Sequence, residues 1–103
     1  MTAYTSLREF IVATRHLNEF ERHYGPQGSW VQLFSQSAGY IQTLLLRDST
    51  DPRRFVTVDR WESDDAYRKF RSTFSRQYAD LDCRCEQLTV RESLIGEFSE
   101  SSG

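Results

Sequence analysis

Lysine is nearly absent from this chain: Lys69 is the only one in 103 residues. The other basic residues are arginines spread along the sequence, and 15 acidic residues outnumber 13 basic ones, which gives a formal charge of -2. Binding to nucleic acid needs a concentrated basic patch that neutralises phosphates. We therefore expect no nucleic-acid partner.

Long hydrophobic runs are also missing, since no apolar stretch approaches the roughly 20 residues that a membrane-spanning helix needs. Near the N-terminus, Arg8 and Glu9 stand where a signal peptide would require a hydrophobic core. These absences predict a cytoplasmic protein with no membrane partner.

Candidate metal ligands are few. Cys83 and Cys85 are the only cysteines, and neither His16 nor His23 lies near them in the sequence. A structural zinc site needs four such ligands, so the C-x-C pair predicts free thiols. The loop at 25–28 lacks the lysine and the glycine spacing of a phosphate-binding loop. We expect no metal and no cofactor.

Aromatic residues, in contrast, are abundant: seven Phe, five Tyr and two Trp make up 14% of the chain. The length suits one domain, which we assign to residues 1–98, with a disordered polar tail over 99–103. A domain of this size buries only about two-thirds of its unfolded surface. A second chain would give the aromatic side chains a larger core.

The hydrophobic pattern switches between strand and helix periods along the chain. Apolar residues at both odd and even positions, as in strands buried on both faces, predict strands over 7–14, 40–48, 55–61 and 88–98. Helical spacing predicts two short helices over 17–24 and 29–38, and one long helix over 64–81 with Ser63 as its N-cap. This order is that of an α+β, ferredoxin-like split βαβ fold with a four-stranded antiparallel sheet.

In that fold the helices cover one face of the sheet only, yet the predicted strands carry apolar residues on both faces. The uncovered face needs a partner. A second copy of the chain is the simplest one, so we expect a homodimer.

Four segments together resemble one protein family. They are RFVTVDRWESDDAYRKF at 54–70, FERHYGPQG at 20–28, the strand at 39–48 and LIGEF at 94–98. The chain resembles the antibiotic biosynthesis monooxygenase family of dimeric α/β-barrel proteins. That family includes cofactor-independent monooxygenases of polycyclic phenols and quinols, haem-degrading enzymes, and proteins without known activity. The resemblance implies a dimeric α/β barrel.

The resemblance also implies site residues. In the members that act on polyketides, a tryptophan at the end of a strand and a tyrosine early in the next helix line the substrate pocket. Trp61 and Tyr67 match these positions, whereas Thr57 stands where those members carry an asparagine. The alternative is that both aromatic side chains are simply large core residues.

Asp59 is the candidate proton acceptor. Alternation places Phe55, Thr57, Asp59 and Trp61 on one face of their strand, and the resemblance turns that face toward the helices. A carboxylate buried there has a perturbed pKa and can act as a base. The alternatives are a structural ion pair, with Arg47 or Arg91, and a position at the rim of the sheet.

Further residues are candidates for the pocket lining. Tyr24, Trp30 and Tyr40 are aromatic, and His23 can face the pocket mouth together with His16. A helix-on-sheet core and surface histidines explain these residues equally well. The haem-degrading members carry an axial histidine in the helix after the tryptophan, and residues 64–82 contain none. Haem degradation is therefore disfavoured.

The leading hypothesis is a cofactor-independent monooxygenase acting on a small aromatic substrate such as a phenol, a quinol or a polyketide. Two alternatives remain: a non-catalytic module that binds a small hydrophobic ligand, and a structural dimer whose pocket is filled. The size of the cavity separates them, because an empty, partly polar cavity beside Trp61 favours a ligand. Filling by Phe34, Phe70 and Phe74 favours the structural dimer.

Overall fold

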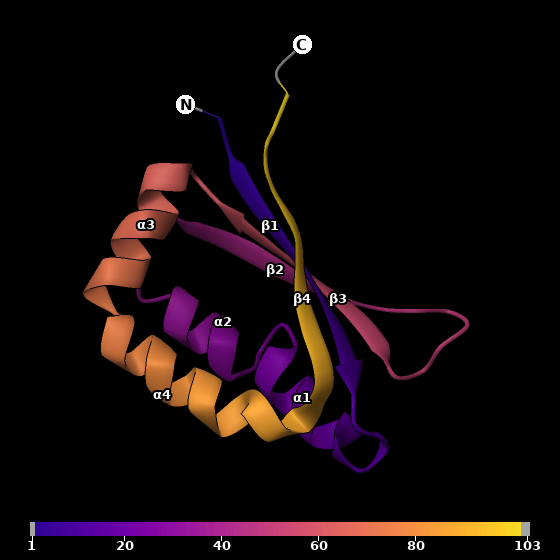
Figure 1. Ribbon diagram of the computed structural model, residues 1–103. Helices are drawn as coiled ribbons and strands as arrows, with labels where there is room; N and C mark the ends of the chain where they lie inside the picture. Colours follow the sequence, from indigo (N-terminus) through magenta and orange to yellow (C-terminus); the bar gives the residue numbers. More distant parts are fainter. Residues whose placement is uncertain (1, 102–103) are drawn as a thin grey trace.

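The computed structural model describes residues 2–101, which form a four-stranded antiparallel sheet in the order β2-β3-β1-β4. The strands are β1 (Tyr4–Val12), β2 (Tyr40–Arg47), β3 (Arg54–Trp61) and β4 (Thr89–Ser99). The helices are α1 (Leu17–Tyr24), α2 (Ser29–Phe34), α3 (Asp64–Thr73) and α4 (Ser75–Cys85), with short 3₁₀ helices at Thr14–His16 and Glu86–Leu88. All four α-helices lie on one side of the sheet (Figure 1). The predicted α+β, ferredoxin-like fold is confirmed.

Two strands extend beyond their predicted limits. β1 begins at Tyr4, which pairs with Trp61 of β3 and Ser99 of β4, and it ends at Val12. Ser99 is therefore a strand residue, and the amide of Glu100 donates a 2.9 Å hydrogen bond to the Ala3 carbonyl. The polar composition of these residues gave no sign of this strand pairing. The last two residues of the predicted tail, 102 and 103, lie outside the described residues.

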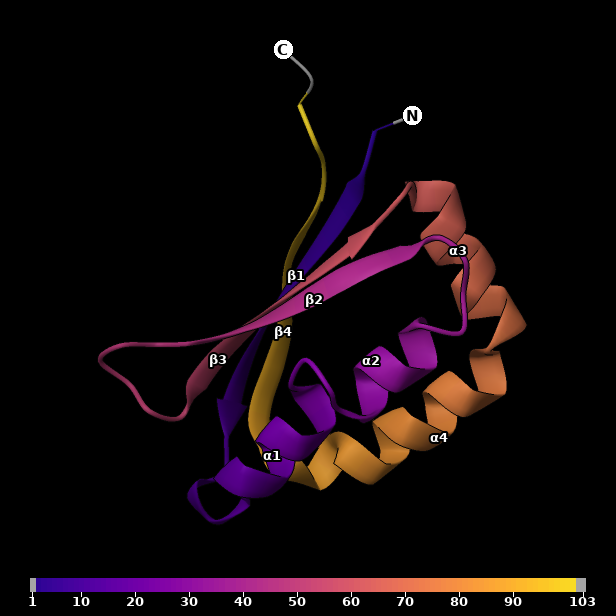
Figure 2. The same ribbon diagram turned by 180° about the vertical axis from the view of Figure 1, so that it is seen from behind.

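The long helix predicted over 64–81 is two helices. Phe74 separates α3 from α4 with φ −109° and ψ 29°, values outside the helical range. A straight helix over this region would be about 30 Å long. The break turns α4 toward α1 and α2 (Figures 1 and 2), and Phe70 of α3 and Leu81 of α4 are both buried in the core.

The junction between β3 and α3 is fixed locally. The Ser63 hydroxyl accepts a 3.0 Å hydrogen bond from the Ala66 amide, as predicted for an N-cap, and Asp64 and Asp65 occupy the first turn. Gly39 passes so close to this turn that a Cβ atom at that position would lie 2.4 Å from the Ala66 Cβ atom. This contact holds the start of β2 against the start of α3.

The core between sheet and helices is mainly aromatic. Its largest fully buried side chains are Trp61, Phe10, Phe20, Phe55 and Phe70. Rings from α1 pack directly on the strands, with Phe20 5.3 Å from Phe10 and 5.0 Å from Phe55 between centroids. Most of the aromatic residues therefore pack in this one layer, and Phe98 is exposed.

The other face of the sheet carries no helix among residues 2–101 (Figure 2). Large apolar side chains are nevertheless exposed on the two edge strands: Ile41, Leu44 and Leu46 on β2, and Val90, Ile95 and Phe98 on β4. Leu94 of β4 is also exposed, but it pairs with Arg8 and so projects from the helix-covered face. Leu44 pairs with Val58 and Leu46 with Val56, so these outward positions continue onto the inner strand β3. We call this helix-free surface the open face.

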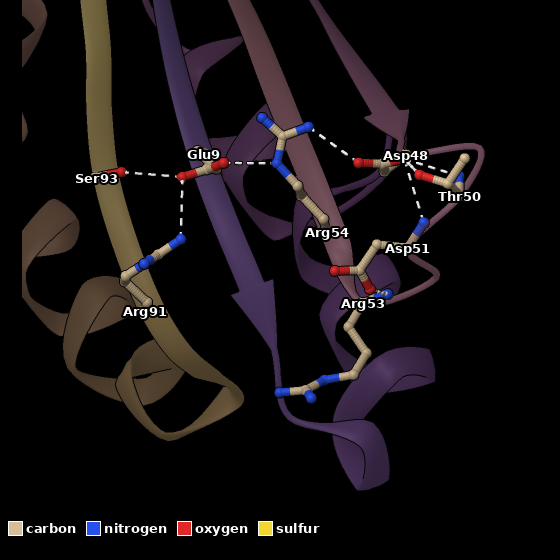
Figure 3. A network of polar contacts seen from close by, with 8 residues as sticks. All are labelled: Glu9, Asp48, Thr50, Asp51, Arg53, Arg54, Arg91 and Ser93. Atoms are coloured by element: carbon tan, nitrogen blue, oxygen red, sulfur yellow. Dashed lines mark hydrogen bonds and ion pairs between the residues drawn. The ribbon is translucent and has the colours of Figure 1, made fainter.

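One end of the open face is polar (Figure 3). Arg54 donates to Glu9 at 2.6 Å and to Asp48 at 3.0 Å, and Arg91 lies 3.7 Å from Glu9. The hydrogen bond from Arg54 lowers the pKa of Glu9, and the backbone amide of Thr50 lowers the pKa of Asp48. The carboxylates of Glu9 and Asp48 therefore stay ionised at neutral pH. Their contacts with Arg54 and Arg91 join the loop between β2 and β3 to β1 and β4.

The two cysteines are free thiols, as predicted, although they lie only two positions apart in α4. Cys83 is exposed and Cys85 is buried. No helix within the described residues is both long and apolar enough to cross a membrane.

Candidate functional site

A cavity of about 40 Å³ lies between the inner face of the sheet and the helices. Side chains from all four strands and from all four α-helices line it. They are Ser6, Arg8, Phe10, Tyr24, Trp30, Phe34, Thr43, Thr57, Asp59, Tyr67, Tyr78, Asp82 and Glu92. The cavity thus combines aromatic walls with a set of polar and charged groups.

Strand register builds the polar floor of the cavity. Asp59 of β3 pairs with Ser6 of β1 and with Thr43 of β2, and paired residues project from the same face. Ser6, Thr43 and Thr57 are buried, whereas Asp59 is partly buried. A row of polar side chains therefore crosses three strands where the rest of the inner face is aromatic.

Asp59 has the most perturbed carboxyl group of the floor. Burial raises its pKa to about 6, while a hydrogen bond from Thr43 and the positive charge of Arg8 act in the opposite direction. The Thr43 hydroxyl donates to Asp59 Oδ1 at 2.7 Å. A carboxylate with a pKa in this range can accept a proton from a bound phenol near neutral pH.

The structural roles considered for Asp59 are not observed. Among the described residues, Arg47 pairs with Glu21 and Arg91 with Glu9, so neither arginine pairs with Asp59. The rim position is also wrong, because β3 is an interior strand of the sheet.

Exposed carboxylates and a cover of aromatic rings mark the opposite side of the cavity. Asp82 of α4 and Glu92 of β4 are exposed, which places the opening between these two elements. The Arg71 guanidinium lies 3.8 Å from the centre of the Tyr78 ring, and its Nη1 donates to the Tyr67 hydroxyl at 3.0 Å. Arg71 thereby holds the two tyrosines together over the cavity.

Trp61 does not line the cavity, contrary to its expected contact with substrate. Its side chain is 0% exposed, and the rings of Phe34, Tyr40, Tyr67 and Phe70 surround it at centroid distances of 5.0 to 5.4 Å. The space beside Trp61 is therefore filled, and the cavity lies further along the sheet. Tyr67 contacts both, since it packs edge-on against Trp61 and lines the cavity.

The other predicted lining residues divide into two groups. Tyr24, Trp30 and Thr57 line the cavity, whereas Tyr40 and His23 do not. The Tyr40 hydroxyl donates to Thr43 at 2.7 Å. His23 Nδ1 lies 2.8 Å from the Ser29 hydroxyl, a contact between α1 and α2 that turns the ring away from the cavity.

Sequence reasoning missed several charged or polar residues of the cavity: Ser6, Arg8, Thr43, Tyr78, Asp82 and Glu92. The signal for two of them was present, because Tyr4, Ser6, Arg8, Phe10 and Val12 alternate along β1. Polar residues at Ser6 and Arg8 interrupt that inward apolar series, and such interruptions mark a polar site. The other four come from β2, α4 and β4, and only the folded chain brings these elements together.

Metal ligation has no geometric support within residues 2–101, where no three His, Cys, Asp or Glu side chains are grouped suitably for an ion. Asp59, Asp82 and Glu92 all line the cavity but do not form such a group.

The sequence pattern that defines the family described as antibiotic biosynthesis monooxygenase matches residues 4–79 of this chain. The chain belongs to this family. The matched region contains β1, β3 and α3, and with them Asp59, Trp61 and Tyr67. The family resemblance found in the sequence is thus confirmed.

Solved structures share the fold over nearly the whole chain. A variant of SnoaB, a cofactor-independent oxygenase from Streptomyces nogalater, superimposes with a TM-score of 0.83 at 18% identity, covering 100% of this chain and 97% of SnoaB. PA3566 from Pseudomonas aeruginosa superimposes with a TM-score of 0.76 at 20% identity, covering 99% of this chain and 97% of PA3566. A conserved protein from Methanosarcina mazei superimposes with a TM-score of 0.80 at 11% identity, covering 98% of this chain and 95% of that protein. At these identities the likeness establishes the fold alone.

No curated protein sequence matches this chain.

Proposed function

We propose that this member of the antibiotic biosynthesis monooxygenase family is a cofactor-independent monooxygenase acting on a small phenol or quinol. The observation that carries the proposal is Asp59, a partly buried carboxyl group with a raised pKa on the floor of an aromatic cavity. Membership of the family and the fold shared with an oxygenase that uses no cofactor support it.

In this reaction the substrate itself supplies the electrons. Asp59 accepts the phenolic proton, and the resulting phenolate reduces oxygen. One oxygen atom becomes a ring carbonyl, and the other leaves with the displaced ring hydrogen as hydroxide, which takes a proton from solvent to become water. Arg8, on the same cavity floor, offers a positive charge to the anion. Tyr24, Trp30 and Tyr67 provide ring faces for offset stacking, which adds about 0.5 to 1.5 kcal/mol per pair.

Substrate entry requires the cover to open. The cavity of about 40 Å³ is far smaller than the roughly 300 Å³ or more of most ligand sites. Tyr67 and Tyr78 with Arg71 form the part that can move, because only side-chain contacts join them there. The same small volume, and the filling of the space beside Trp61 by Phe34 and Phe70, favour the alternative of a structural dimer. The second candidate function that a binding experiment can test is a module that holds a small hydrophobic ligand without chemistry.

Oxygen consumption separates these two candidates. We expect the protein to accelerate oxygen uptake with at least one member of a panel of naphthols, anthrols and hydroquinones, and mass spectrometry should find one added oxygen atom. Quenching of Trp30, which lines the cavity, reports binding independently. Quenching with uptake at the uncatalysed rate across the panel would favour the binding module.

We further propose that the chain acts as a homodimer joined through the open face. The exposed apolar side chains of β2 and β4 support this, since contiguous apolar surface on a folded domain usually marks an interface. The partner is expected to pack its own open face on this one, which closes the two sheets into a barrel.

Light scattering tests the dimer: the wild-type protein should have about twice the mass of one chain. Leu44→Glu should yield a folded monomer, because this side chain is 47% exposed in the single chain and a carboxylate there is tolerated until a partner covers it. Lys69→Glu, on the exposed surface of α3, is the matched control and should remain dimeric. A wild-type monomer at micromolar concentration would overturn the proposal.

A further inference from the structure

Three side chains form a continuous hydrogen-bonded chain that begins in the cavity. Tyr40 donates from its hydroxyl to Thr43 Oγ1 at 2.7 Å, and Thr43 donates to Asp59 Oδ1 at 2.7 Å. Both distances are typical of O–H···O hydrogen bonds. Each hydroxyl is a donor and an acceptor at once, which is the requirement for passing a proton along.

The two ends of this chain lie in different surroundings. Asp59 lines the cavity on the interior strand β3, whereas Tyr40 is the first residue of the edge strand β2 and does not line the cavity. Thr43 is 9% exposed and bridges the two strands at their paired positions. Tyr40 is only partly buried on this edge strand, although burial still raises the pKa of its hydroxyl.

We propose that Thr43 and Tyr40 form a proton path that returns the proton accepted by Asp59 to solvent at the β2 edge while the cavity is occupied. This inference rests on the proposed monooxygenase function. It assigns Thr43 and Tyr40 as positioning residues that act through Asp59, and it replaces the substrate contact expected for Tyr40.

The transfer reverses the two hydrogen bonds and returns Asp59 to its ionised form. Protonated Asp59 donates its proton to Thr43 Oγ1, the Thr43 hydroxyl proton passes to the Tyr40 oxygen, and the Tyr40 proton passes to water. Rotation of the two hydroxyl groups then restores the original directions. A chain is needed because a ligand between Asp59 and the opening would exclude water from the carboxyl group.

The other charged groups around Asp59 do not offer an equivalent path. Arg8 of β1, Tyr67 of α3, Tyr78 and Asp82 of α4, and Glu92 of β4 all face the cavity. Among the described residues none of these five forms a hydrogen bond or an ion pair with Asp59. Arg8 acts only through its charge, which opposes the rise in the Asp59 pKa.

The first test is independent of activity and uses carbon-13 NMR of the unliganded full-length protein. In the wild type, the Tyr40 Cζ resonance should show a pH transition at the pKa of Asp59, because the two groups are linked through Thr43. Thr43→Val should remove this transition and raise the pKa of Asp59 by about one unit, since the carboxylate loses a hydrogen bond. Thr43→Ser keeps the hydroxyl and should retain both features. Thr73→Val, at an exposed position of α3, is the matched control.

The second test measures oxygen uptake with a quinol substrate. Tyr40→Phe breaks the path beyond Thr43 and should slow turnover about tenfold or more while substrate binding, followed by Trp30 quenching, stays unchanged. The solvent deuterium isotope effect on turnover should rise in this variant. Turnover at the wild-type rate in Tyr40→Phe, or a Tyr40 resonance that does not respond to Asp59, would overturn the proton path. An inactive wild-type protein would instead refute the monooxygenase function, and the NMR coupling alone would then decide whether the path exists.

Discussion

Asp59→Asn should stabilise the folded protein at pH 8 while abolishing oxygen consumption. Burial raises the pKa of Asp59 to about 6 in the folded protein, compared with about 3.9 in an unfolded chain. The folded state therefore binds the proton more tightly. The stability that this group contributes is fully present below about pH 4 and is lost as the pH rises through 6. Asparagine carries no charge, so the stability of the variant does not fall as the pH rises through 6.

Urea denaturation at two pH values measures the effect. The variant should gain about 3 kcal/mol over the wild type at pH 8 and only about 1 kcal/mol at pH 4.5. Asp80→Asn, at an exposed position of α4, should show no such gain. Oxygen uptake by Asp59→Asn should fall by about 100-fold or more, the usual contribution of a general base. A gain that does not depend on pH would show that the ionised carboxyl group is not the cause.

Trp61→Ala is expected to lower the free energy of unfolding by about 3 to 5 kcal/mol. The Trp61 side chain is completely buried, and four aromatic rings from α2, β2 and α3 contact it. Removing the indole leaves a hole that this rigid cluster cannot collapse to fill. Trp61→Phe keeps one ring in place and should lose less than half as much.

Denaturant titration of both variants gives these losses, and ligand quenching gives a second readout. Trp61→Phe should retain the quenching that a cavity ligand produces, whereas Trp30→Phe should lose it, because Trp30 lines the cavity and Trp61 does not. Quenching that disappears only in the Trp61 variant would mean that the ligand displaces the surrounding rings and reaches the indole.

Periodicity in the sequence predicted the elements and their order because burial imposes it directly. Phe55, Thr57, Asp59 and Trp61 alternate along β3 and face the helices as expected. The N-cap at Ser63 was likewise visible, since capping depends on a few neighbouring residues. Local rules therefore sufficed for the sheet, for the helix start and for the face on which Asp59 lies.

Features that depend on contacts between residues distant in the sequence could not be predicted. The break at Phe74 has no glycine or proline to signal it, so the apolar spacing over 64–81 predicts one helix. Whether Trp61 borders the cavity depends on how Phe34, Tyr40 and Phe70 fill the space around its indole. The partners of Asp59 lie on other strands, so only the register of the sheet identifies Thr43.

The contrasting surroundings of the two cysteines give the chain a natural attachment point for a spectroscopic label. Burial raises the pKa of the Cys85 thiol, which keeps it protonated and out of reach of a maleimide. Cys83 is exposed and directly follows Asp82 at the opening of the cavity. A fluorophore or spin label introduced without any mutation would therefore go to one site per chain, beside the opening, where movement of the aromatic cover is expected.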